Sequence, residues 1–265
     1  MSDNIIDTSK PSAGRIYDYL LNGSHNFEID RQAAEQIIAA SPYVKKLARL
    51  QRWALKDIAV ELSVNRGLDV IIDFASGLPT ADHIHTNVPK GTTVIYSDFD
   101  PVVVEFSQQI LKDTPDVYYF ENDACLPEKL LNRPEVQKIL AGRRKVGIGY
   151  WGFCTFLNDE ELSHSLRVLY EWSAPGSCLA YNAQSVLDIT KPDIIAAMEI
   201  YKNMGAPFHV RSLEKHQEIL NPWKMDETGF VSLLNWHGFD ESEFAELDEN
   251  SFGPTKGDYG VYMTR

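Results

Sequence analysis

Three aspartates stand at equal intervals in this chain, each at the end of a short apolar segment. Asp73, Asp98 and Asp123 are separated by 25 residues each. The segments before them are rich in valine, isoleucine and tyrosine, which is typical of buried strands. In an open parallel sheet, ligands bind beyond the carboxyl ends of the strands, near the point where the strand order reverses. The spacing therefore predicts that the three carboxylates line one crevice.

These acids suit a ligand that carries ribose and adenine. Asp98 follows the second expected strand, where a carboxylate accepts hydrogen bonds from ribose hydroxyls in nucleotide-binding folds. Asp123 is placed to accept a hydrogen bond from an adenine amino group. The loop Ala75-Ser76-Gly77 lets a ligand approach the backbone, because glycine has no side chain in the way.

The glycine pattern separates the two main ligand classes. A dinucleotide pyrophosphate needs a G-x-G-x-x-G turn at a helix N-terminus. Here the first loop holds Gly77 alone, with Pro79 two residues later. This favours an adenosyl ligand without phosphate, such as S-adenosylmethionine, and leaves an NAD-linked oxidoreductase as a weaker alternative.

The elements that position these acids alternate between strand and helix. A helical pattern covers residues 11–62, with Asp30 as an expected helix cap and Ser41-Pro42 as an expected helix start. Lys45, Arg49, Arg52 and Lys56 form a basic stripe that is expected to face solvent. Five strands are predicted at 70–74, 93–97, 117–121, 146–150 and 177–181, with two later ones near 230–234 and 259–263. Alternating strands and helices imply right-handed crossovers and a parallel sheet covered on both faces.

Composition limits the classes of function. The chain has 265 residues and a net charge of −13, which disfavours nucleic acid as a partner. It has no apolar run as long as the ~18 residues that a membrane helix requires, and no secretory signal is visible at its start. Its three cysteines, which form no CxxC pair, are most simply explained by a reduced, cytoplasmic setting.

Two blocks around these acids, 73–80 and 96–102, resemble class I S-adenosylmethionine-dependent methyltransferases. Residues 11–30, with the pattern R-x-Y-D-Y-L-L-x-G-x-x-N-F from Arg15 to Phe27, are similar to the start of a bacterial family of such proteins with undefined substrates. The resemblance covers roughly residues 11–240. It implies a three-layer Rossmann-like α/β sandwich with a seven-stranded, mostly parallel sheet. Residues 1–66 would form an N-terminal helical lid in the same domain as the cofactor-binding part, residues 67–265.

The resemblance also implies a set of cofactor-binding residues. Asp73 and the backbone of Ala75, Ser76 and Gly77 would hold the methionine end. Asp98 would hold the ribose and Asp123 the adenine amino group, with Phe99 and Ala124 beside the ring. Tyr150 and Trp151 would flank the sulfonium, and the lid would contribute Arg15, Tyr19, Asn22 and Asn26. The family usually has glycine where this chain has Ala75, whose methyl group disfavours a positive φ.

The expected reaction is an in-line displacement, to which the protein contributes mainly proximity, alignment and exclusion of water. The catalytic residues are unknown. Weak candidates are His25 as a base near the acceptor, Tyr19, and Trp151, whose aromatic face would stabilise a cation. A metal at His83 and His85 lacks an evident third ligand, so no metal is expected. A nucleophilic Cys154 lacks a visible base.

The sequence thus predicts a methyltransferase that uses S-adenosylmethionine on a small-molecule acceptor. The alternative is a non-catalytic protein that binds S-adenosylmethionine or S-adenosylhomocysteine and keeps the fold. Nothing in the sequence identifies the acceptor, the acceptor atom or the oligomeric state.

Overall fold

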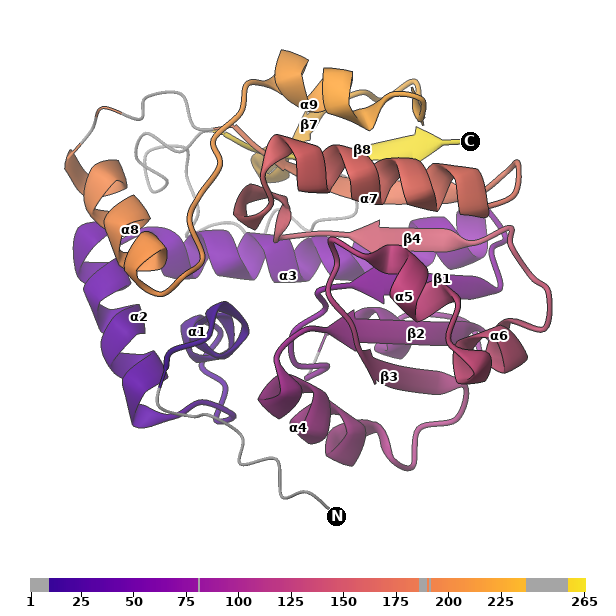
Figure 1. Ribbon diagram of the computed structural model, residues 1–265, viewed down its shortest axis with the longest axis horizontal. Helices are drawn as coiled ribbons and strands as arrows, with labels where there is room; N and C mark the ends of the chain where they lie inside the picture. The colour runs from indigo at the N-terminus through magenta and orange to yellow at the C-terminus, as the bar shows by residue number, and fades with distance from the viewer. Residues whose placement is uncertain (1–9, 81, 186–189, 191, 237–256) are drawn as a thin grey trace.

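A computed structural model describes residues 10–80, 82–185, 190, 192–236 and 257–265 (Figure 1). An N-terminal helical block comes first, with α1 (Ala13–Leu20), α2 (Glu28–Ala40) and α3 (Val44–Val60), which continues into a π-helical turn at Glu61–Asn65. The strands are β1 (Val70–Phe74), β2 (Thr93–Asp98), β3 (Val117–Glu121), β4 (Gly147–Tyr150), β5 (Cys178–Gln184), β6 (Lys224–Met225), β7 (Val231–Ser232) and β8 (Asp258–Thr264). The remaining α-helices are α4 (Pro101–Leu111), α5 (Pro127–Leu131), α6 (Pro134–Leu140), α7 (Asp159–Trp172), α8 (Pro192–Asn203) and α9 (Leu213–Leu220).

The strands form one sheet in the order β3-β2-β1-β4-β5-β8-β6, with β7 also paired to β8. The first five strands are parallel, and β8 runs antiparallel to β5. This confirms the Rossmann-like fold and its mostly parallel sheet. The described residues contain eight strands where seven were expected, because β6 and β7 are separate strands of two residues each. The chain order reverses at β1, which lies between β2 and β4.

The central strands are buried on both faces. Every residue of β1 and β2 is buried, as expected for strands with helices on both sides. One core cluster contains Ile72, Ile148 and Leu179, and the other contains Ile71, Val94 and Ala180. Neighbouring residues of one strand therefore pack on opposite faces, and the parallel strands all end at the edge that faces α1, α2 and α8 (Figure 1).

Helix starts follow the expected capping chemistry in the sheet region and differ in the N-terminal block. The side chain of Asp100 accepts a hydrogen bond from the Val102 N–H before Pro101 opens α4, and Asn158 caps α7 in the same way. Two expectations were wrong. Helix α2 begins at Glu28, so Asp30 is its third residue and not its cap, and α3 begins at Val44 and not at Pro42.

The reason for the position of Asp30 is a buried ion-pair cluster. The Arg15 Nε atom lies 2.8 Å from Asp30 Oδ2, and Arg15 Nη1 lies 2.7 Å from Asp100 Oδ2. The Asp30 carboxylate also accepts hydrogen bonds from the backbone N–H groups of Ser12 and Phe27. One guanidinium therefore joins α1, α2 and the start of α4, and it fixes the helical block against the carboxyl edge of the sheet.

None of the helices in the described part of the chain has both the length and the apolar character required to cross a membrane.

Replacing Arg15 with methionine tests this ion-pair cluster. We expect R15M to lower the free energy of unfolding by about 3–5 kcal/mol, because two buried carboxylates lose their charged partner. Urea unfolding followed by circular dichroism measures the change. R31M is the matched control, since Arg31 pairs with Glu28 on the exposed surface of α2 and exposed pairs contribute little. Equal stability of R15M and R31M would contradict a structural role for Arg15.

Candidate active site

A cavity of about 250 Å³ lies between the carboxyl edge of the sheet and the helices α1, α2, α3 and α8. The sheet and its loops supply the three carboxyl groups of the described wall, whereas the helices supply mostly apolar side chains. The lining residues from the sheet side include Asp73, Ala75, Ser76, Gly77, Asp98, Phe99, Trp151, Gln184 and Asp258. Seven of the fourteen cofactor-site residues expected from the sequence are among them: Asp73, Ala75, Ser76, Gly77, Asp98, Phe99 and Trp151.

The loop after β1 is held by hydrogen bonds on both sides of its backbone. The Ser76 N–H donates to the Ser97 carbonyl at 2.9 Å, and the Gly77 N–H donates to Asp98 Oδ2 at 3.0 Å. The Gly77 carbonyl accepts from the Tyr119 hydroxyl at 2.6 Å. Because N–H groups and a carbonyl group of this loop are all hydrogen-bonded to the sheet, the loop forms a rigid wall of the cavity.

The side chain of His83 supports the same loop through a hydrogen bond to its backbone. His83 Nε2 lies 3.1 Å from the Ser76 carbonyl, and His83 Nδ1 lies 2.9 Å from the Tyr96 hydroxyl. Because a carbonyl can only accept, Nε2 carries the proton. Burial lowers the pKa of His83 well below its ordinary value, so the ring is neutral. The buried His83 and its neighbour His85, which also bonds Tyr96, thus have a supporting role in the loop.

Ala75 adopts a backbone conformation that favours glycine. Its φ is +49°, and Gly77 in the same loop has a φ of +62°. The left-handed region costs an ordinary L-residue roughly 1–2 kcal/mol. The structure therefore shows the strain that the alanine was expected to introduce, while the loop keeps its hydrogen bonds.

Two buried carboxylates face the cavity beside this loop. Burial raises the pKa of Asp73 to about 7 and the pKa of Asp98 to about 6. The Asp98 side chain is partly satisfied by the backbone N–H groups of Gly77 and Asp100. Space for Asp73 comes from Gly149 on the neighbouring strand, where an added Cβ would lie 2.0 Å from Asp73 Oδ1. No sequence pattern had indicated this role of Gly149.

Arg52 is the main cofactor-site candidate that the sequence analysis missed. Its side chain lines the cavity and the residue is 6% exposed, so the expectation that it faces solvent was wrong. Nη2 lies 3.4 Å from the Leu78 carbonyl, and the guanidinium carbon lies 5.6 Å from the centre of the Tyr17 ring, whose hydroxyl it also influences. Nε and Nη1 make no hydrogen bond of good geometry with any described residue. The guanidinium also lowers the pKa of Asp73, although burial of that carboxyl has the larger effect. A signal was present in the sequence, since Arg52 lies four residues after Ala48 and three before Leu55, on the apolar face of α3.

A third buried acid, Asp258, reaches the cavity from the last strand. Gln51 Nε2 donates to Asp258 Oδ2 at 2.8 Å, and Asn182 Nδ2 donates to Oδ1 at 2.6 Å. Burial raises the pKa of Asp258 to about 7, although both amide hydrogen bonds oppose that shift. The sequence analysis had expected a strand here but assigned no role to its first residue.

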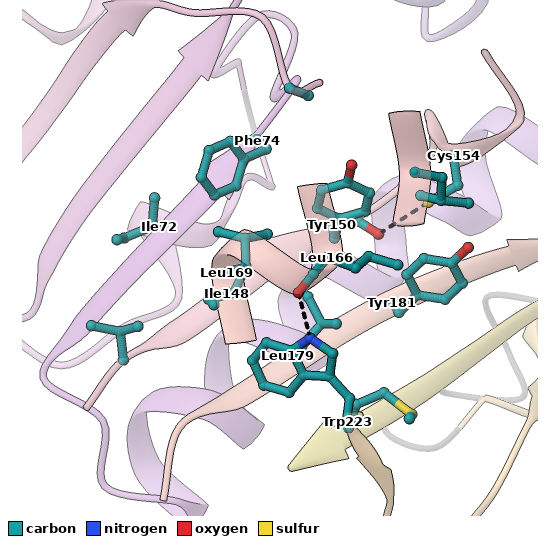
Figure 2. Packing of buried hydrophobic residues seen from close by; sticks show 14 of the residues in the cluster. Ile72, Phe74, Ile148, Tyr150, Cys154, Leu166, Leu169, Leu179, Tyr181 and Trp223 are labelled. Carbon is teal, nitrogen blue, oxygen red and sulfur yellow. Dashed lines mark hydrogen bonds between the residues drawn. The ribbon is translucent and has the colours of Figure 1, made fainter. Parts of the chain in front are cut away.

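Several other expected site residues lie elsewhere. The side chain of Tyr150 is fully buried in the core and its hydroxyl bonds Ser165, and Figure 2 shows it among Phe74, Leu166 and Tyr181. Ala124 also packs in this core cluster. Asp123 is exposed and accepts a hydrogen bond from the Cys125 N–H. Neither of these last two belongs to the described lining of the cavity, and their adenine roles stay predictions.

The residues named in the lid serve its own structure. Arg15 is occupied by its two aspartates, and Asn26 donates to Asp18 and to the Gly23 carbonyl. Tyr19 bonds Glu35 on the surface, and the His25 ring packs edge-on against Phe106. Helix α1 does line the cavity, but it does so through Ala13, Gly14, Tyr17 and Leu20. Of the three catalytic candidates, Trp151 is the one found in the described lining.

Comparison with known proteins identifies the family of this chain. A family model described as S-adenosyl methyltransferase matches residues 1–257. The chain belongs to this family, and it is therefore an S-adenosylmethionine-dependent methyltransferase. No curated protein is detectably similar to it in sequence.

Solved structures show the same fold over the whole chain. A DUF574 family protein from Streptomyces avermitilis has 25% sequence identity and a TM-score of 0.86, with 98% of this chain and 99% of that chain covered. A protein from Thermobifida fusca has 26% identity and a TM-score of 0.86, with coverages of 98% and 97%. A methyltransferase from Anabaena variabilis that depends on S-adenosylmethionine shares the fold at 13% identity and a TM-score of 0.51, with coverages of 76% and 78%.

Replacing Ala75 with glycine tests the strain in the loop. We expect A75G to raise the free energy of unfolding by up to about 1 kcal/mol, since relief of about 1–2 kcal/mol of strain exceeds the ~0.4–1 kcal/mol that glycine loses through the freer unfolded chain. Urea unfolding measures the difference. A141G is a useful comparison, because Ala141 has the same φ of +49° at the end of α6, far from the loop. A destabilised A75G beside a stabilised A141G would contradict this account.

Proposed function

We propose that this methyltransferase transfers a methyl group to a small apolar molecule bound in the described cavity. The observation that carries the proposal is the buried Arg52, whose Nε and Nη1 lack hydrogen-bond partners among the described residues. A buried guanidinium with free donors is costly unless a ligand supplies acceptors. A carboxylate is the group that fits its planar fork.

The polar half of the cavity fits the cofactor group by group. S-adenosylmethionine supplies, when bound, an electrophilic methyl group on a sulfonium. Arg52 suits the carboxylate of its methionine part and Asp73 suits the ammonium. Asp98 has accepting capacity left for ribose hydroxyls, and the exposed ring of Phe99, which is 65% exposed, offers a face for adenine stacking. Arg52 and Asp73 therefore match the two charges of an amino acid, and Asp98 matches the hydroxyl groups of a ribose.

The other half of the cavity suits an apolar acceptor. Ile37, Leu47 and Tyr201 line it from the helices, and Phe208 lines it from the segment after α8. Tyr201 and Phe208 stack with ring centroids 4.4 Å apart, and Phe156 packs against both. A wall of this kind binds an organic molecule by burial of apolar surface.

The chain's own residues contribute alignment and exclusion of water. Helices α1, α2 and α8 cover the carboxyl edge of the sheet, and the rigid loop after β1 fixes one side of the cavity. Trp151 and Tyr17 present aromatic faces to it, and such faces stabilise a positively charged group. Holding two reactants in line in a dry site accounts for much of the rate of a displacement reaction.

Replacing Arg52 with methionine tests the cofactor site directly. We expect wild-type protein to bind S-adenosylmethionine in calorimetric titration and not NAD. R52M should weaken this binding by about tenfold to a hundredfold, the range for loss of a charge-assisted hydrogen bond. R49M is the matched control, since Arg49 is exposed on the same helix. Equal affinity of R52M and R49M, or no binding by wild type, would refute the proposed site.

The pH dependence of cofactor binding tests Asp73. Its pKa is raised to about 7, so the carboxyl is protonated at pH 5.5 and a bound ammonium must displace that proton. Affinity for S-adenosylmethionine should therefore rise about tenfold or more from pH 5.5 to pH 7. Titration of wild type and D73N across this range measures the slope. A slope that is as steep in D73N would show that another group is responsible.

A further inference from the structure

The acid Asp258 has a position that the family assignment does not explain. It opens β8, the strand that runs antiparallel to β5 and pairs Asp258 with Gln184. The first residue of an antiparallel strand lies at the edge where the parallel strands end, so Asp258 shares that edge with Asp73 and Asp98. It is three strands from Asp73 in the order β1-β4-β5-β8, and in the paired register it lies four residues beyond the level of Asp73. The two carboxyl groups therefore line separate parts of the same cavity.

The surroundings of Asp258 hold its carboxylate firmly and leave it acceptor capacity. Gln51 of α3 and Asn182 of β5 each donate one hydrogen bond, to different oxygens. Each carboxylate oxygen accepts more than one hydrogen bond, so both can take another donor. Asp258 is 7% exposed and lines the same cavity as Tyr201 and Phe208. Gln51 and Gln184 line the cavity beside it, and a buried carboxylate in an uncharged part of the wall selects a ligand that brings a hydrogen-bond donor.

We propose that Asp258 is the general base for the acceptor, and that the acceptor is a flat apolar molecule with a phenol-like hydroxyl group that donates to this carboxylate. This rests on the proposed function. In the reaction the hydroxyl proton passes to an Asp258 oxygen. The electron pair of the acceptor oxygen forms the O–CH₃ bond while the C–S bond breaks, and its electrons stay on sulfur. The proton leaves Asp258 for water after the methyl ether is released.

The charges around Asp258 agree with this role. Its pKa of about 7 is suited to a base that acts near neutral pH. Burial is the main cause that raises the pKa of Tyr17 in α1 and of Cys154 in the turn after β4 to about 12. The charge of Asp258 raises both pKa values further. Both therefore stay protonated near neutrality, and neither competes as the base. The Arg52 guanidinium and the Asp73 carboxyl line the same cavity.

The ligand choice follows from the neutral and aromatic character of the wall. A carboxylate acceptor would place a second negative charge beside Asp258, and a charged amine would lose its hydration in the apolar half of the cavity. A neutral hydroxyl on a ring avoids both costs. The ring packs against the cluster of Phe156, Tyr201 and Phe208, while its hydroxyl reaches Asp258.

The test compares two probes, 2-naphthol, which can donate a hydroxyl proton, and 2-methoxynaphthalene, in which a methyl group replaces that proton. Their dissociation constants are measured by equilibrium dialysis with the full chain at pH 8 and pH 5.5. At pH 8 Asp258 is ionised, and 2-naphthol should bind about tenfold to a hundredfold more tightly. At pH 5.5 the carboxyl is protonated, and the preference should fall to a few-fold. In D258N and D258A the dissociation constants of the two probes should differ by no more than about threefold at both values of pH.

Two controls separate this proposal from the cofactor site. D73N should weaken S-adenosylmethionine binding but keep the 2-naphthol preference and its pH dependence, whereas D258N should keep cofactor binding. The pH dependence is measured on the wild-type protein, so this part of the test does not depend on whether a variant folds. Failure of wild type to bind either probe, a preference that is constant with pH, or a preference that persists in both Asp258 variants would overturn the proposal. Absence of S-adenosylmethionine binding alone would refute the cofactor site and leave standing only the hydrogen bond between Asp258 and the hydroxyl probe.

Discussion

The cavity exists because one buried guanidinium holds the helical block against the sheet. Arg15 contacts Asp30 of α2 and Asp100 at the start of α4. Asp100 is also the residue that caps α4, and it lies two positions after Asp98. The short segment from Asp98 to Asp100 therefore has two roles. Asp98 ends β2 and lines the cavity, and Asp100 binds Arg15 of the helices that cover the cavity. The lid is therefore coupled to the cofactor half of the site through this ion-pair cluster.

The polar groups of the cavity are arranged to be completed by a ligand. Asp73, Asp98 and Asp258 are all buried, with burial as the leading cause of their raised pKa values. Near them lies a guanidinium with two donors unpaired among the described residues. Arg52 and Asp73 lie close enough to influence one another, yet no hydrogen bond joins their side chains in the described structure. A zwitterionic group placed between them, such as the methionine part of the proposed cofactor, would satisfy both.

Sequence reasoning identified the part of the cavity lining that depends on strand ends. Asp73, Asp98 and the loop from Ala75 to Gly77 were predictable because parallel strands bring their carboxyl ends to one edge. Asp258 was missed because it begins an antiparallel strand. The first residue of such a strand, and not its last, lies at the edge where the parallel strands end. Arg52 was missed because its charge outweighed its position on the apolar face of α3. Tyr150 was placed in the site because it ends β4, but strand alternation directs its side chain into the core while Trp151 turns to the cavity.

The division of the cavity explains why the family assignment identifies the cofactor but not the acceptor. The proposed cofactor half is built from the ends of β1 and β2, the loop after β1 and Arg52 of α3, and the order of a parallel sheet fixes all of these parts except Arg52. The proposed acceptor half is built from side chains of α2, α3 and α8, from Phe156 and Phe208 in the segments after β4 and α8, and from the first residue of β8. Side chains on covering helices can change without altering the sheet, so the same fold can accept different molecules. In this chain those positions hold aromatic and aliphatic groups around one carboxylate. Such a combination favours an acceptor that is apolar in its body and gives up a proton where it is methylated.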